Sequence, residues 1–135
     1  MSNPQRILKW SLLAGAIYFF GIATVHMFGI KLPLLFIYFN VPSNAYQDRI
    51  ISFLAFGWAI FMYTAYTDPE KQVGLVRAIL VAGAGAIVGL AIINISTDFH
   101  AYDTEINPTI FWWETAGVFG YWLWLVFFYV RSKQP

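Results

Sequence analysis

The sequence predicts an all-α integral membrane protein built as a four-helix bundle, and three observations support this prediction. Of its 135 residues, 59% are hydrophobic and only 11% are charged, whereas a soluble domain has about 25% charged residues. Four separate stretches are apolar over the roughly 20 residues that a helix needs to cross a bilayer. No stretch alternates with the two-residue period of a membrane β-strand. We therefore expect residues 1–135 to form a single domain of four transmembrane helices.

The composition also excludes several classes of function. The chain has 8 Lys and Arg against 7 Asp and Glu, for a net charge of +1. Too few charged side chains are present to cover a soluble enzyme, and this net charge gives no attraction for nucleic acid. The absence of Cys excludes disulfides, thiolate metal sites and iron–sulfur clusters. We expect membrane lipid to be a partner and nucleic acid not to be one.

The first predicted helix covers residues 7–29 and follows two basic residues, Arg6 and Lys9. Basic residues ahead of an apolar run are also typical of signal peptides. However, only residues 10–13 separate Lys9 from the small residues at 14–16, and the apolar region of a signal peptide needs about 7–15 residues. We therefore expect this segment to be retained as a membrane span.

Residues 31–47, between the first and second helices, are apolar over Leu32–Phe39, a stretch too short to cross a bilayer. Pro33 and Pro42 bracket most of it, which is typical of an interfacial or re-entrant segment. We expect either a cover in the headgroup layer or a gate over a cavity that opens toward the outer leaflet. The second helix, residues 50–66, follows.

The third and fourth predicted helices cover residues 73–96 and 108–130. The third is rich in small residues, and the fourth is heavily aromatic. Small residues four positions apart allow helices in a membrane to approach closely. We interpret three such pairs as packing positions: Ala82/Ala86, Gly85/Gly89 and Ala116/Gly120.

The basic residues are distributed unequally between the two sides of the predicted bundle. One side carries six, and they are Arg6, Lys9, Lys71, Arg77, Arg131 and Lys133. The other side carries only Lys31 and Arg49. Because basic loops favour the cytoplasmic side, we expect both termini in the cytoplasm, with the bacterial inner (plasma) membrane as the location.

Two ionisable residues lie inside predicted spans: His26 near the outer end of the first and Glu114 about two turns inside the fourth. Charged groups within a bilayer are costly, so each is a candidate functional residue. Helical spacing puts His26 on one face with Ser11 and Gly15, and Glu114 on one face with Tyr121. We therefore expect His26 and Glu114 to point inward and to meet near the outer surface as candidate catalytic residues.

Other residues at this outer level, or on the same helix faces, complete the predicted site. The candidate ligand-binding residues are Asn94, Asp98, Arg49, Trp113 and Tyr121, and the candidate metal ligands are His26, Asp98, His100 and Glu114. Three interpretations stay open. In the first, the polar layer only stabilises the bundle, with a rim salt bridge of Asp48, Arg49 and Asp98. In the second, it binds a lipid-like molecule, and in the third, it holds a metal or haem.

The function expected from these patterns is that of a small polytopic binding or accessory component. It would recognise a lipid-like ligand, a larger membrane complex or a second copy of itself through the outer polar layer. One alternative is a membrane enzyme of isomerase or oxidoreductase type on an apolar substrate, with Glu114 and His26 as an acid–base pair. The other is a metal- or haem-binding membrane protein. No stretch carries a motif that assigns a family or a cofactor.

Overall fold

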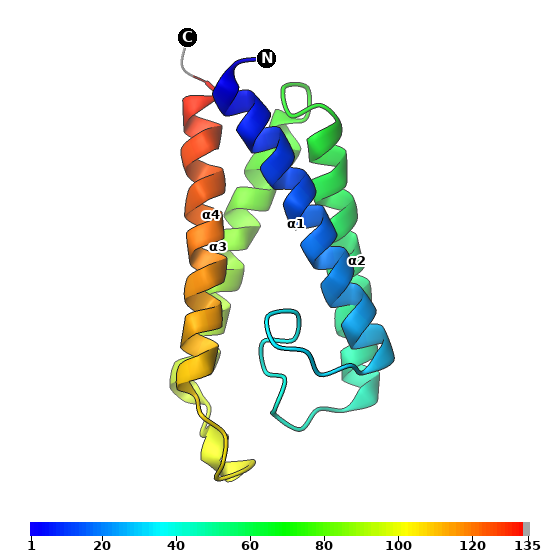
Figure 1. Ribbon diagram of the computed structural model, residues 1–135, viewed down its shortest axis with the longest axis vertical. Coiled ribbons are helices and arrows are strands. Elements are labelled where there is room, and N and C mark those ends of the chain that lie inside the picture. Colours follow the sequence, from blue (N-terminus) through cyan, green and yellow to red (C-terminus); the bar gives the residue numbers. More distant parts are fainter. Residues whose placement is uncertain (134–135) are drawn as a thin grey trace.

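The computed structural model describes residues 1–133 and confirms the all-α architecture, because every regular element in that range is helical. The elements are α1 (Asn3–Phe28), α2 (Ala45–Thr67), α3 (Val73–Ser96), the short 3-10 helix η1 (Phe99–Ala101) and α4 (Thr109–Arg131). The four long helices run alternately up and down (Figure 1). The start of α1, the end of α4 and the α2–α3 loop therefore lie at one end of the molecule, which we call the closed end. We call the opposite end the open end.

Local capping explains where α1 and α2 begin. α1 starts at Asn3, ahead of the predicted residue 7, because Ser2 and Gln5 form a capping box and Pro4 occupies the first turn. α2 starts at Ala45 rather than near residue 50. The Asn44 side chain accepts a hydrogen bond from the Tyr46 N–H at 2.9 Å, which caps the helix.

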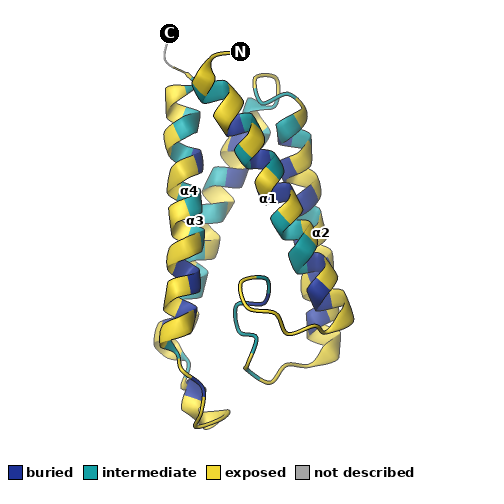
Figure 2. Cartoon of the chain, in the orientation of Figure 1, coloured by how far each residue is buried: buried dark blue, intermediate teal, exposed yellow. Residues whose placement is uncertain are grey.

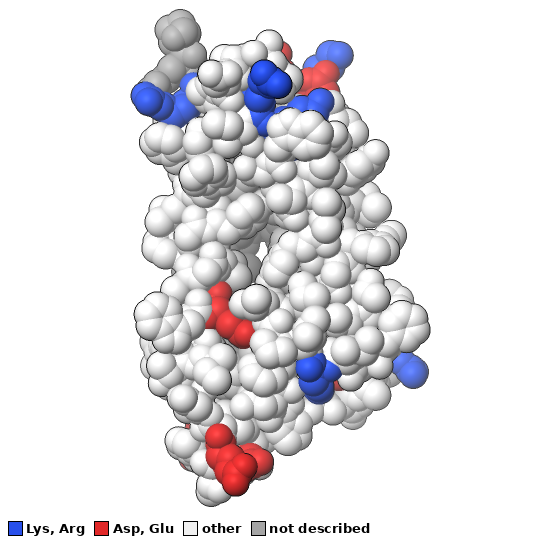
Figure 3. Space-filling view, viewed as in Figure 1, with Lys and Arg blue, Asp and Glu red and all other residues white. Residues whose placement is uncertain are grey.

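Three of the helices, α1, α2 and α3, are long and apolar enough to cross a membrane. α4 has 23 residues, as α2 does, but it is rich in Trp and Tyr. The face drawn in Figure 3 has a broad uncharged band across its middle, interrupted by a single acidic patch. The other charged side chains on this face gather at the two ends. This distribution fits a bundle that lies across a bilayer.

The four helices follow one another around the bundle, so that α1 contacts α2 and α4, and α3 contacts the same two helices. The largest interface is that between α1 and α2. A hydrophobic core at the closed end joins all four helices, and its buried members are Leu8, Leu12, Ala16, Met62, Ala65, Val76, Ile79 and Leu125. Figure 2 shows the buried positions on the inward faces of the helices.

Toward the open end, the α1–α2 pair and the α3–α4 pair diverge, and residues 29–44 fold back between them (Figure 1). We call residues 29–44 the wedge. A second core at this end consists of Phe99, Ile106 and Phe111, with Tyr38 and Val41 of the wedge packed against it. The segment that connects α1 to α2 is therefore part of the interior at the open end.

The small residues do not pack as the sequence predicts. No atom lies within 4 Å of a Cβ built at Gly85, Gly89 or Gly120, so these positions make no close helix contact. Large α4 side chains instead fill the space between helices: Tyr121 donates to the Ser11 carbonyl and Trp122 to the Leu80 carbonyl, each at 2.7 Å. The Tyr121 and Trp122 rings keep the helix backbones too far apart for small residues to meet. The prediction that the small-residue pairs are packing positions is therefore wrong.

Candidate functional site

The wedge is organised around one strained residue, Leu34. Its φ of +70° is left-handed, a conformation that costs a non-glycine residue roughly 1–2 kcal/mol. The Leu34 N–H donates to Glu114 Oε1 at 2.9 Å, and the Leu34 carbonyl accepts from the Tyr18 hydroxyl at 2.5 Å. The two backbone polar groups of Leu34 therefore connect α4 to α1 across the open end.

Glu114 lies in the second turn of α4 and is only 7% exposed. While Oε1 accepts the Leu34 amide, the buried Oε2 has no hydrogen-bond partner within the described residues. A buried polar atom without a partner costs about 1–3 kcal/mol. In Figure 3, the surface is hollowed at mid-height between the two helix pairs, and acidic atoms lie beside the hollow.

A chain of buried hydrogen bonds joins the wedge to α3 and α4. The Tyr38 hydroxyl donates to Asn94 Oδ1 at 2.8 Å, and Asn94 Nδ2 donates to Thr115 Oγ1 at 3.0 Å. Thr115 Oγ1 in turn donates to the Phe111 carbonyl at 2.7 Å. Burial, with a smaller contribution from the Glu114 charge, raises the pKa of Tyr38 to about 12, so the phenol keeps its proton and acts as a donor.

Replacing Tyr38 by Phe removes the donor at the start of this chain. Because Asn94 Oδ1 is then left without its partner in a buried site, we expect Tyr38→Phe to lower the free energy of unfolding by about 1–3 kcal/mol. The measurement is chemical or thermal unfolding in detergent, with Tyr102→Phe as the control because Tyr102 is exposed. Equal stability of the two variants would contradict a structural role for this hydrogen bond.

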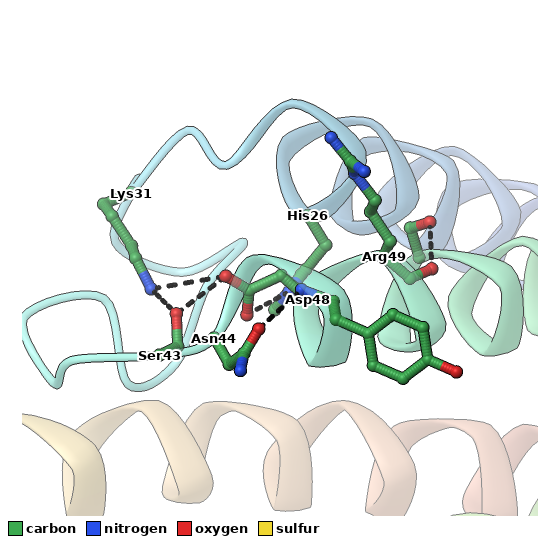
Figure 4. A network of polar contacts seen from close by, with 8 residues as sticks. His26, Lys31, Ser43, Asn44, Asp48 and Arg49 are labelled. Carbon is green, nitrogen blue, oxygen red and sulfur yellow. Dashed lines mark hydrogen bonds and ion pairs between the residues drawn. The ribbon is translucent and has the colours of Figure 1, made fainter.

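A second polar cluster lies on the other side of the wedge, around Asp48 of α2 (Figure 4). Ser43 Oγ donates to Asp48 Oδ2 at 2.7 Å, and Lys31 Nζ lies 3.8 Å from the same oxygen and also donates to Ser43 Oγ. His26 Nδ1 is 3.8 Å from Asp48 Oδ1, which is too far for a hydrogen bond. The buried Asp48 carboxylate is therefore the centre of a network with three neighbours, of which His26 is buried and Lys31 and Ser43 are exposed.

Phe36 of the wedge packs against this cluster. Its ring stacks on His26, with centroids 3.7 Å apart and an interplanar angle of 18°, and Lys31 Nζ lies 3.8 Å from its centroid. A pocket of about 270 Å³ adjoins the cluster, and its lining includes His26, Gly29, Lys31, Ser43, Asp48 and Arg49. His26 is buried, and its Nδ1 has no hydrogen-bond partner among the described residues.

His26 and Glu114 are both buried, but the expected contact between them is not seen. Within residues 1–133, no hydrogen bond or ion pair joins the two side chains. His26 lies beside Asp48 and Phe36, whereas Glu114 accepts a hydrogen bond from the Leu34 N–H. The wedge provides a separate neighbour for each residue, Phe36 for His26 and Leu34 for Glu114. The structure therefore shows no direct contact between the two residues of the predicted acid–base pair.

The other sequence-predicted residues fall into three groups. Asn94 is buried and bonded to Thr115, and Arg49 lines the pocket. Tyr121 bonds to Ser11 of α1 and packs against the closed-end core, away from the wedge. The third group consists of exposed side chains, which are Trp113, Asp98 and His100.

Arg49 forms no ion pair with Asp48 or Asp98 in the described part of the chain, so the predicted rim salt bridge is not formed. Among the same residues, no group of three or more His, Cys, Asp or Glu side chains is placed to hold a metal ion. The predicted set of His26, Asp98, His100 and Glu114 is thus not brought together. Asp98 and His100 belong to the segment beyond α3, whereas His26 faces α2 and the wedge.

Sequence reasoning did not assign a role to Lys31, Ser43, Tyr38 or the Leu34 amide. Lys31 carries a usable signal, since it is one of only two basic residues predicted on its side of the membrane. The Leu34 amide carries none, because a backbone N–H is common to all residues except proline.

Comparison of the chain with protein families, with curated proteins and with solved structures finds no match.

Proposed function

We propose that this protein binds a lipid-like molecule whose polar end carries a hydrogen-bond donor, with the wedge as the cover of the site. The observation that carries the proposal is the unpartnered, buried Oε2 of Glu114 beside the wedge. A hydroxyl or ammonium group would satisfy this oxygen, and the apolar helix surfaces on either side suit a hydrocarbon body. Acid–base chemistry is not proposed, because His26 and Glu114 do not contact each other.

The cover role is supported by the way the wedge is held. The middle of the wedge is bonded to the helices by the two hydrogen bonds at Leu34 and the one from Tyr38, while Lys31 and Ser43 near its two ends contact Asp48 of α2. The left-handed conformation of Leu34 costs roughly 1–2 kcal/mol. This cost is similar to the net stabilisation of roughly 0.5–1.5 kcal/mol that a single hydrogen bond provides, and it opposes the closed arrangement. A segment held by few bonds against local strain is suited to opening on a slow timescale.

The location that we propose is the bacterial inner membrane, with both termini in the cytoplasm. Six of the eight basic residues are at the closed end or in its flanking turns, which is the distribution of a cytoplasmic side. We further propose that α4 crosses the bilayer together with α1, α2 and α3. The start of α1 and the end of α4 both lie at the closed end (Figure 1), and three crossings alone would put them on opposite sides.

The test compares two probes of equal chain length, octadecylamine, which donates hydrogen bonds, and methyl octadecanoate, which does not. Native mass spectrometry of the detergent-solubilised protein measures the binding of each. We expect the wild type to retain octadecylamine preferentially, and Glu114→Gln to bind it roughly 10- to 100-fold less well, since a hydrogen bond to a charged group contributes about 1.5–3 kcal/mol.

Glu105→Gln is the matched control, because Glu105 is an exposed acid outside the helices. It is expected to bind octadecylamine as the wild type does. Equal retention of both probes, or equal loss of binding in the Glu114 and Glu105 variants, would remove the basis of the proposal.

A further inference from the structure

The pocket at the ends of α1 and α2 is separate from the Glu114 site, and the two ends of the wedge contribute Gly29, Lys31 and Ser43 to its lining. It lies where α1 ends at Phe28 and α2 begins at Ala45, so it is at the level where a bundle of this length meets lipid headgroups. Its volume of about 270 Å³ is enough for a small polar group.

The charges that line the pocket favour an anion. Two cations, Lys31 and Arg49, line it together with one carboxylate, Asp48. Asp48 is buried and already has Ser43 as a donor and Lys31 and His26 as neighbours. The Arg49 guanidinium points away from this network (Figure 4), and no hydrogen bond or ion pair engages it within residues 1–133. The uncompensated charge of the lining is therefore positive.

The N-terminus of α2 adds to this preference. The pocket is bordered by Ala45, the first residue of α2, and a helix N-terminus carries a partial positive charge, although Asn44 caps the Tyr46 N–H and Asp48 lies in the first turn. On the opposite border, Gly29 ends α1 with a φ of +66°, and a Cβ built there would meet no atom within 4 Å. The entrance at Gly29 is therefore open.

His26 supplies the independent sign of a ligand. Its side chain is 8% exposed and lines the pocket, yet Nδ1 has no hydrogen-bond partner among the described residues. The ring is fixed in place by stacking on Phe36. The nearest acceptor oxygen to Nδ1, Asp48 Oδ1, is 3.8 Å away and beyond hydrogen-bond distance, so no acceptor of the described residues engages this nitrogen, and the imidazole can donate an N–H to a ligand oxygen.

We infer that this pocket binds a phosphate-type anion, held by Arg49, Lys31, His26 and the N-terminus of α2. The multiple oxygens of a phosphate accept hydrogen bonds from donors on several sides, and a guanidinium matches them with two parallel bonds. The phosphate belongs either to a lipid headgroup or to a free anion in solution, and the two sources share this chemistry.

The test for the lipid source uses native mass spectrometry in a neutral detergent with phosphatidic acid and diacylglycerol of identical acyl chains. These two lipids differ only in the phosphate. We expect phosphatidic acid to bind at least about tenfold more tightly than diacylglycerol. Titration with inorganic phosphate, followed by ³¹P NMR line broadening, tests the free anion; binding in either arm supports a phosphate site and identifies its source.

Arg49→Gln is the main variant, because Arg49 is exposed and its replacement leaves the packing intact. We expect it to weaken phosphate-type binding about tenfold or more, and His26→Phe, which keeps a ring against Phe36, to weaken it severalfold. Lys133→Gln removes an exposed positive charge at the closed end and is the matched control. The inference is overturned if diacylglycerol binds as tightly as phosphatidic acid while inorganic phosphate does not bind, or if Arg49→Gln behaves as Lys133→Gln does.

Discussion

Glu114→Ala is expected to release the wedge from α4 and to give the largest change in local opening of any single substitution in this chain. The variant removes the oxygen that accepts the Leu34 N–H, and this amide has no other acceptor among the described residues. Losing such a hydrogen bond costs about 1–3 kcal/mol, and 1.4 kcal/mol is a factor of ten. Hydrogen exchange followed by mass spectrometry should therefore show the Leu34 amide exchanging about 5- to 100-fold faster.

Glu114→Gln separates this effect from the binding effect of the carboxylate. Glutamine keeps a side-chain oxygen of the same reach, so Leu34 should exchange at nearly the wild-type rate while octadecylamine binding is lost. Leu34→Gly is a second check, because glycine adopts a positive φ without strain. That variant should slow opening of the wedge. Unchanged exchange at residue 34 in Glu114→Ala would show that Glu114 does not hold the wedge.

Gly15→Ala is expected to give the largest loss of global stability among the glycine positions. A methyl group at Gly15 would overlap both Met62 Sδ and the Tyr121 hydroxyl. Met62 is flexible but buried in the closed-end core, and Tyr121 is fixed by its bond to the Ser11 carbonyl. Overpacking of this kind costs about 1–3 kcal/mol, so the melting temperature in detergent should fall by several degrees.

Gly57→Ala is the matched control for Gly15→Ala. Gly57 is also in the middle of a long helix, but no atom lies within 4 Å of a Cβ built there. Alanine is favoured over glycine in a helix by up to about 1 kcal/mol, so this variant should be as stable as the wild type or slightly more so. Equal melting temperatures of the two variants would show that α1 and α4 are not closely packed at Gly15.

The helices, and the inward direction of their polar residues, were predictable because helical periodicity and the cost of polar groups in lipid act locally. His26 and Gly15 share a buried face of α1, as their spacing predicts, and Glu114 is buried on α4. Asn94 is buried on α3 for the same reason. These positions follow from a period of 3.6 residues and need no knowledge of the neighbouring helices.

The partners of these residues were not predictable, because they depend on a segment without periodicity. The path of the wedge is fixed by the conformation of Leu34 and by Phe36 stacking on His26, and neither has a signal in the residue pattern. A direct pair of His26 and Glu114 was expected from helical spacing and the cost of ionisable groups in lipid, while the apolar residues 32–39 were expected to form a cover in the headgroup layer or a gate over a cavity. In the structure, part of that stretch lies inside it.

Movement of the wedge is tested most directly by pulsed electron spin resonance between two introduced labels. The chain has no Cys, so Leu32→Cys in the wedge and Trp113→Cys on α4 give a single labelled pair, and both native side chains are exposed. Saturation with octadecylamine should produce a second, longer distance between the labels, and Glu114→Ala should populate that distance without the probe. A single distance distribution that neither the probe nor the substitution changes would contradict a movable cover.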